Sequence, residues 1–279
     1  MIFFYDKFLC FYLMYKFIKI THTNFMMKLI ELKKDFQNAI KNQEFQVYLQ
    51  PKVDTAEKLV GAEALIRRVK KDVVIFPDEF ISLYENLGFI IQLDLYVMEQ
   101  VCKLLQNWNK KGIYLPISVN ESPKHLMNEE HGKDLLNLLN TYHVLPQFIE
   151  LEVTEGAVIQ DIKIAKKAQA RMHELGFLTS MDDFGVGYSS FSMLRSIPID
   201  ILKIDKSFLG GLLKHRRYQI ILESIIDMAH KLRIKTVMEG VETREEVEYL
   251  KEIGCDILQG YFFDQPLPIS KFEEKYFSI

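Results

Sequence analysis

Two adjacent acidic residues stand directly before a glycine-containing loop. In the stretch SMDDFGVGYSS (180–190), Asp182 and Asp183 precede a loop that carries Gly185 and Gly187. Two neighbouring carboxylates repel each other unless a positive charge lies between them. The pair therefore indicates a site for one or two cations, and the glycines allow the loop to turn tightly beside it.

Other short apolar segments also finish on polar residues. They end at Glu63, Asn120, Glu152, Lys203 with Asp205, Glu239 with Glu242, and Gln259. Carboxylate and amide oxygens suit the hard ions Mg²⁺ and Mn²⁺, whereas Zn²⁺ favours His or Cys. The histidines from His125 onward fall in predicted helices or loops, and Lys203 is the single lysine among the strand ends. So many acids around one lysine cannot all stay ionised without further positive charge.

Alternating strand and helix patterns must bring these residues together. Apolar runs predict strands at 45–51, 58–68, 114–120, 148–155, 177–184, 199–205, 234–241 and 255–261, with amphipathic helices between them. About eight strands in roughly 230 residues predict an α/β fold, a (βα)8 TIM-like barrel whose strand ends meet at one rim. A doubly wound open sheet is the alternative, although no Gly-rich dinucleotide or phosphate loop follows a strand.

Composition limits the classes of partner and compartment. The chain has 279 residues, of which 48% are hydrophobic, and a formal net charge of −3. Because there is no basic excess, tight binding to long nucleic acid is not expected. The three cysteines are far apart and lack CxxC spacing, which argues against a disulfide framework and favours a reducing cytoplasm.

Residues 1–26 are predicted to be an extension outside the fold, and residues 27–279 to form one domain. The first twenty residues are rich in aromatics, but four charged residues interrupt them, and the apolar run 8–15 is too short to span a bilayer. No small-residue cleavage site of a secretory signal follows. A weak membrane association through residues 1–25 is the alternative interpretation.

The order of the motifs resembles the EAL-domain family, phosphodiesterases of the second messenger cyclic di-GMP. GAEALIRR (61–68) contains the Glu-Ala-Leu signature, and the chain also carries YLQPKVD, FPDEFISLYENLGFI, ISVNES, IELEVTE, DDFGVGYSSFSMLRSIPIDILKIDKSF, MEGVET and LQGYFFDQPLP in the family's order. The resemblance implies a (βα)8-like barrel with one antiparallel strand. It also implies hydrolysis of cyclic di-GMP to linear pGpG in a cleft at the strand carboxyl ends.

The resemblance further implies roles for individual residues. The family's metal ligands fall on Glu63, Asn120, Glu152, Asp182 and Asp183. Its catalytic positions fall on Lys203, Glu239 and Glu63, and its substrate contacts on Gln50, Leu65, Arg67 and Gln259. The acids that position the loop after the aspartates fall on Glu155 and Glu242. Two Mg²⁺ or Mn²⁺ ions would activate a water for attack on phosphorus, whereas Ca²⁺ is expected to inhibit.

Some positions depart from the family's usual residues. Arg68, Val186 and Glu121 stand where Trp, Thr and an apolar residue are common, but none of them is a matched metal ligand. Non-catalytic relatives that act as cyclic di-GMP receptors typically lose ligands, whereas every matched ligand is present here. A catalytically weak or inactive receptor is the alternative function. Family members often dimerise through the barrel, so a homodimer is a further expectation.

The spacing of two glutamates makes a local prediction. Side chains alternate along a strand, so Glu152 and Glu155 would point to opposite faces if one strand contained both. They converge only if the strand has ended by Thr154. Glu155 is then expected to accept hydrogen bonds from the loop at 185–190 instead of binding a cation.

Overall fold

The computed structural model describes residues 27–186 and 191–278, which form two compact units divided after Phe45. The first unit contains a helix over residues 27–41 and a contact between the rings of Phe36 and Phe45, whose centroids are 5.9 Å apart. The extension predicted at residues 1–26 and the membrane association considered for residues 1–25 lie outside the described residues. Along the described residues, no helix combines the length and the apolar character needed to cross a bilayer.

A mixed sheet forms the centre of the second unit. Its strands are β1 (Phe45–Asp54), β2 (Leu59–Lys70), β3 (Val73–Ile75), β4 (Ile117–Asn120), β5 (Ile149–Thr154), β6 (Leu178–Phe184), β7 (Ile201–Ile204), β8 (Lys235–Met238), β9 (Ile257–Leu258) and β10 (Leu267–Pro268). The order β1-β9-β8-β7-β6-β5-β4-β2 closes through the pairing of β1 with β2. Within this closed order, each pair of neighbours from β9 through β4 to β2 is parallel, whereas β1 runs antiparallel to β9. Strands β3 and β10 lie outside this order and are antiparallel to β2 and β1. The predicted TIM-like barrel with one antiparallel strand is confirmed, and the open sheet is excluded.

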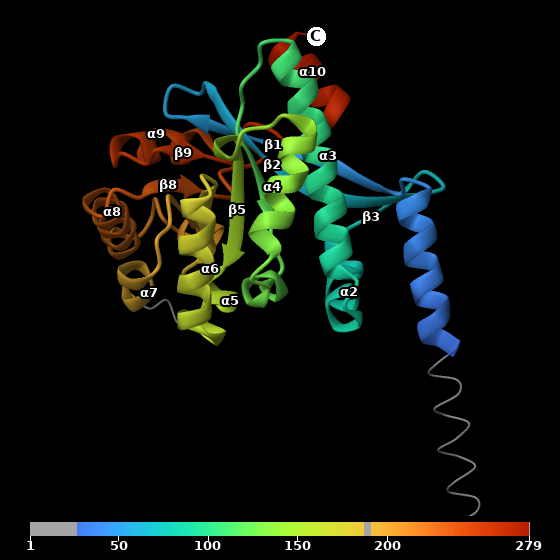
Figure 1. Ribbon diagram of the computed structural model, residues 1–279. Helices are drawn as coiled ribbons and strands as arrows, with labels where there is room; N and C mark the ends of the chain where they lie inside the picture. Colours follow the sequence, from blue (N-terminus) through green and yellow to red (C-terminus); the bar gives the residue numbers. More distant parts are fainter. Residues whose placement is uncertain (1–26, 187–190, 279) are drawn as a thin grey trace, which may run out of the picture. The chain divides into compact units, whose positions relative to one another are not determined.

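Helices cover the outside of this barrel (Figure 1). They are α2 (Ile81–Leu87), α3 (Ile90–Lys110), α4 (His131–Tyr142), α5 (Glu155–Gln160), α6 (Ile162–Glu174), α7 (Phe191–Ser196), α8 (Arg216–Lys231), α9 (Arg244–Glu252) and α10 (Ile269–Phe277). One apolar cluster contains Met193, Leu222 and Val247, and the other contains Trp108 and Phe272. Apolar side chains fill the space between strands and helices, whereas Glu63, Glu152 and Lys203 are buried polar residues that lie on strands of the barrel.

The turn that joins β1 to β2 fixes the register of β1. The Oδ1 atom of Asp54 accepts the backbone N–H groups of Ala56 and Lys58, each at 2.9 Å. The N–H of Asp54 donates to the carbonyl of Lys58, and Glu57 between them adopts a left-handed conformation with φ of 60°. Such an aspartate side chain stabilises a tight turn by replacing backbone contacts. The two strands are thereby locked at this end of the hairpin.

Candidate active site

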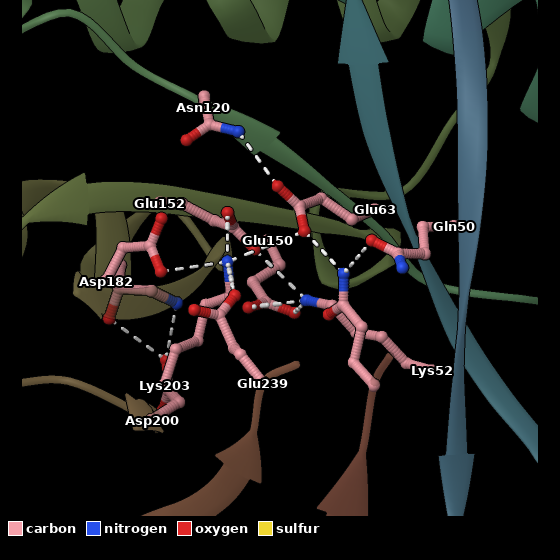
Figure 2. A network of polar contacts seen from close by, with 12 residues as sticks. Gln50, Lys52, Glu63, Asn120, Glu150, Glu152, Asp182, Asp200, Lys203 and Glu239 are labelled. Carbon is pink, nitrogen blue, oxygen red and sulfur yellow. Dashed lines mark hydrogen bonds and ion pairs between the residues drawn. The ribbon is translucent and has the colours of Figure 1, made fainter. Parts of the chain in front are cut away.

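A buried lysine lies at the centre of the acidic residues. Lys203 on β7 is 0% exposed, and its Nζ lies 2.7 Å from Glu152 Oε2 on β5. The same nitrogen lies 2.9 Å from Asp182 Oδ1 on β6 and 2.9 Å from Glu239 Oε1, directly after β8 (Figure 2). The parallel strands therefore bring together at their carboxyl ends four residues that are far apart in the sequence, as predicted.

Glu63 on β2 connects this group to the other side of the barrel. Its Oε1 accepts a hydrogen bond from Asn120 Nδ2 at 3.1 Å (Figure 2). Its Oε2 accepts one from Gln259 Nε2 at 2.6 Å. The Gln259 amide also donates to Gln50 Oε1 at 3.1 Å. Lys203 Nζ lies 3.6 Å from Glu63 Oε2. The strand-end residues thus form one continuous polar network.

A bulge in β6 explains how two consecutive aspartates serve the same site. The pairing with β7 passes from Met181–Leu202 to Phe184–Ile204, which leaves one extra residue on β6. Asp183 takes a left-handed conformation with φ of 57°, and its N–H donates to Asp182 Oδ1 at 3.0 Å. A bulge redirects side chains that would otherwise alternate between faces. One carboxylate oxygen from each of Asp182, Asp183 and Glu239 lies within 4.8 Å of the others, a group that could hold a metal ion.

The site contains more negative than positive charge, and the pKa values reflect this. Burial, together with the charges of Asp182 and Glu63, raises the pKa of Glu239 to about 8, against the opposing effect of Lys203. Burial acts in the same direction on Glu152, but Lys203 and Lys52 outweigh it and lower the pKa of Glu152 to about 2. The surrounding carboxylates raise the pKa of Lys203 well above its usual value in spite of burial. Lys203 is therefore a cation near neutral pH.

A second buried lysine lies beside the first, whereas the sequence analysis counted only Lys203 among the strand ends. Lys52 Nζ lies 3.0 Å from Glu150 Oε2 and 3.1 Å from Glu152 Oε1 (Figure 2). Neither Lys52 nor Glu150 ends a strand, so a search of strand ends overlooks both. A usable signal was present: in IELEVT, Glu150 and Glu152 alternate with apolar residues and therefore share one face of β5.

A cavity of about 300 Å³ opens beside the network. Of the residues expected to act in the site, it is lined by Gln50, Glu63, Leu65, Glu239, Glu242 and Gln259. Asp205, a strand-end residue with no assigned role, also lines it, as do Lys206 and Tyr261, which sequence reasoning did not select. The cavity thus joins expected substrate contacts to the acidic network.

Two residues that were predicted to act in the site, Arg67 and Glu242, make no hydrogen bond or ion pair with the acidic network over the residues that the structure describes. The Arg67 guanidinium is not part of the cavity lining among the described residues, and it lies 5.1 Å from the centre of the Phe76 ring and 5.8 Å from that of Tyr48. The Glu242 carboxylate is exposed and makes no hydrogen bond or ion pair with the described part of the chain. Its expected role in positioning the loop therefore gains no support from a contact.

Glu155 lies where the strand-end reasoning placed it. Strand β5 ends at Thr154, whose hydroxyl accepts the N–H of Ala157 and caps α5, so Glu155 is the first residue of that helix. Its Oε2 accepts the backbone N–H of Gly185 at 3.0 Å. Gly185 has a φ of 105°, and a Cβ there would lie 2.0 Å from the Phe208 ring, so this position requires glycine.

The fold and the network define a class of protein. Residues 33–266 match the EAL domain family, and the chain belongs to this family. It is 38% identical over 240 residues to the signaling protein YkoW of Bacillus subtilis, and 36% identical over 248 residues to the cyclic di-GMP phosphodiesterase NbdA of Pseudomonas aeruginosa. These alignments cover 85% and 88% of this chain but 30% and 32% of the relatives. The chain therefore spans about a third of the length of these relatives.

Solved structures agree with the fold. The structure "PaMucR Phosphodiesterase, c-di-GMP complex" superimposes with a TM-score of 0.81 at 30% identity, and the match covers 87% of this chain and 99% of that chain. An EAL domain protein from Listeria monocytogenes superimposes with a TM-score of 0.77 at 34% identity, with 87% and 96% of the two chains covered.

Proposed function

We propose that this chain hydrolyses cyclic di-GMP to linear pGpG in a reaction that depends on Mg²⁺ or Mn²⁺, with two ions bound. The observation that carries the proposal is the buried network around Lys203, in which carboxylates from four strands or strand ends converge beside a cavity. Relatives named as cyclic di-GMP phosphodiesterases share the domain that contains this network.

The charges of the network fit divalent cations. Six carboxylates lie in it, from Glu63, Glu150, Glu152, Asp182, Asp183 and Glu239, and the ammonium groups of Lys52 and Lys203 accompany them. If all are ionised, four negative charges are left over, which is the charge that two divalent ions would neutralise. All candidate ligand atoms are oxygens, as Mg²⁺ and Mn²⁺ prefer. Glu63, Asn120, Glu152, Asp182 and Asp183 would hold the ions, with Glu239 as a further ligand beside the aspartates.

The protein groups have separable tasks in this proposal. Bound divalent ions supply an activated water and neutralise charge on the phosphate. Lys203 holds Glu152, Asp182 and Glu239 around one point and places the attacking water there. Gln50, Leu65 and Gln259 line the cavity and would orient the dinucleotide, and Arg67 would contact its phosphate after leaving the aromatic rings. Glu155 would keep the backbone at Gly185 in place.

The test is incubation of purified protein with cyclic di-GMP, followed by chromatographic separation of the nucleotides. We expect pGpG to form with Mg²⁺ or Mn²⁺, no product in EDTA, and recovery when Mn²⁺ is added back. Ca²⁺ should support binding of the dinucleotide with little turnover, because it is larger and less demanding in geometry. Turnover that survives thorough metal removal would refute the metal-dependent mechanism. Tight binding of cyclic di-GMP without product under every metal condition would instead establish the receptor function.

The cellular setting follows from the same proposal. Cys102 and Cys255 are buried free thiols, which agrees with a reducing compartment, and we place the reaction in the cytoplasm. A homodimer remains an expectation from the family, to be checked by the mass of the purified protein in solution.

A further inference from the structure

Two charged residues behind the candidate metal site have no task in the proposed hydrolysis. Lys52 and Glu150 are only 2% and 4% exposed. Lys52 Nζ contacts both oxygens of Glu150, at 3.1 and 3.0 Å, and also Oε1 of Glu152, at 3.1 Å (Figure 2). A charged pair at such depth costs desolvation energy, and apolar residues of similar size would often stabilise the fold equally well. Stability alone therefore does not account for the pair.

The pair lies one layer deeper in the barrel than the strand ends. Glu150 precedes Glu152 by two residues on β5, so its side chain has the same orientation about 7 Å further from the rim. The aliphatic part of Lys52 passes Gly61, where a Cβ would lie 3.7 Å from the Lys52 Cβ. Gly61 likewise precedes Glu63 by two residues. Lys52 thus reaches the network from below, alongside Gly61.

Each oxygen of the Glu152 carboxylate contacts a different lysine. Oε1 contacts Lys52 at 3.1 Å, and Oε2 contacts Lys203 at 2.7 Å. Lys203 is shared with Asp182 and Glu239 on the rim side, whereas the other partner of Lys52 is Glu150 on the deep side. One oxygen of Glu152 therefore faces the deep layer and the other faces the acidic network.

We propose that Lys52 is a positioning residue, whose ammonium group fixes Oε1 of Glu152 so that Oε2 faces the divalent cation. Glu150 neutralises Lys52, so the lysine orients a ligand without cancelling negative charge that attracts the cations. This inference rests on the proposed function, since it assigns Glu152 to the metal site. Groups that orient a metal ligand typically change metal affinity by about 10–100-fold when they are removed.

Replacing Lys52 by methionine distinguishes two effects of the lysine on Mn²⁺ binding, namely the orientation of the Glu152 carboxylate and the repulsion of the cation by a positive charge. Lys52→Met removes a positive charge from an acidic cluster, so electrostatics alone would make Mn²⁺ bind more tightly. If Lys52 instead positions Glu152, the variant should bind Mn²⁺ about 10–100-fold more weakly. The affinity is measured with Mn²⁺ alone, from the electron paramagnetic resonance signal of the free ion, and thermal unfolding in EDTA verifies that the variant is folded. Equal or tighter binding by folded Lys52→Met overturns the inference.

A double variant covers the case in which Lys52→Met does not fold because Glu150 is left uncompensated. Lys52→Met/Glu150→Gln removes both charges and leaves the net charge unchanged, and buried pairs often tolerate such joint replacement. We expect its Mn²⁺ affinity to fall by at least about tenfold. Unchanged affinity, or failure of both variants to fold, would make the pair structural and overturn the inference.

The matched control is Asp256→Asn. Asp256 Oδ2 accepts the N–H and the hydroxyl of Thr236 at 2.8 and 2.9 Å, near the amino end of β8 and away from the rim. This change should lower the unfolding temperature without altering Mn²⁺ binding, and an equal loss of Mn²⁺ affinity would mean that general loosening explains the Lys52 result. The assay needs no turnover. Mn²⁺ binding by the wild-type protein without hydrolysis refutes the proposed enzyme and leaves this test valid, whereas absence of Mn²⁺ binding refutes the proposed cofactor before any variant is made.

Discussion

Glu155 and Gly185 are joined by a hydrogen bond of 3.0 Å between the Glu155 carboxylate and the Gly185 backbone N–H, across thirty residues of sequence. The contact connects the first residue of α5 to the segment that follows Asp183. Glu155 itself is 2% exposed, so the bond is shielded from water. The conformation of the chain after the two aspartates therefore depends on an acid that does not belong to the Lys203 network.

Glu155→Ala should weaken Mn²⁺ binding by about 10–100-fold, the range typical for groups that support metal ligands. The backbone at Gly185 loses its acceptor, so its amide should exchange with solvent faster than in the wild-type protein. Mn²⁺ titration and amide hydrogen exchange measure the two effects. Glu245→Ala, at an exposed position on α9, is the control and should change neither. Wild-type Mn²⁺ affinity together with wild-type exchange at Gly185 would show that Glu155 has no part in the site.

Asp182→Asn should reduce turnover of cyclic di-GMP by more than the about 10–100-fold expected for supporting residues, because it alters a proposed ligand directly. The metal-free protein should be as stable as the wild type or more stable, since a repelling charge is removed from a crowded cluster. Steady-state kinetics and thermal unfolding in EDTA test the two parts. An unfolded variant whose folded fraction retains wild-type specific activity would assign Asp182 a structural role.

The metal-free protein should lose stability as the pH rises from about 5 to about 8. The pKa of Glu239 in the folded state is about 8, whereas an unperturbed glutamate titrates near about 4.3. The folded state therefore binds this proton more tightly than the unfolded chain. The resulting stabilisation is complete below the unfolded pKa and disappears as the pH rises through the folded pKa. Burial also raises the pKa values of Glu63 and Asp182, which adds to the same trend.

Thermal unfolding in EDTA across this pH range measures the effect, and Glu239→Gln should show a shallower slope. Added Mn²⁺ should raise the unfolding temperature more at pH 8 than at pH 5, because the ion competes with protons for the carboxylates. Glu152, with a pKa of about 2, loses its own contribution only in strong acid and does not mask the trend. A Glu239→Gln variant with the wild-type slope would disprove this assignment.

A protein that begins at Met27 should retain its fold and its turnover. The family match starts at residue 33, and the proposed site residues all lie at position 50 or beyond. Circular dichroism and the nucleotide assay test this expectation. A loss of folding or of specific activity would give residues 1–26 a structural role, and a shift from membrane to soluble fractions would support the surface association considered for residues 1–25.

The rule that parallel strands share one rim was sufficient to predict that Glu63, Glu152, Asp182 and Lys203 converge. The end of β5 at Thr154 was also predictable, because Glu152 and Glu155 have incompatible positions in a single strand. The bulge at Asp183 was not, since a residue with φ of 57° has no distinct signature in the letters DDFG. Lys52 was not predicted for another reason. It lies within the antiparallel strand β1, to which the rule about the carboxyl ends of parallel strands does not apply. For Arg67, the match to the family predicts a contact with substrate. It does not predict that the guanidinium lies near the rings of Phe76 and Tyr48 in the protein without substrate.

The turn between β1 and β2 determines which face of β1 points toward the site. Side chains at even-numbered positions of β1 lie on one face, and those at odd-numbered positions lie on the other. Gln50 and Lys52 reach the network because both stand at even positions on β1, while the apolar residues Leu49 and Val53 flank them at odd positions. A shift of one residue in strand pairing would exchange the two faces and present apolar side chains to the acids. Asp54, four residues after Gln50 on β1, opposes this shift because its carboxylate accepts two backbone N–H groups of the turn. An odd-numbered length change in 55–58 should therefore weaken metal binding while leaving every acidic residue in place, and an even-numbered change should be better tolerated.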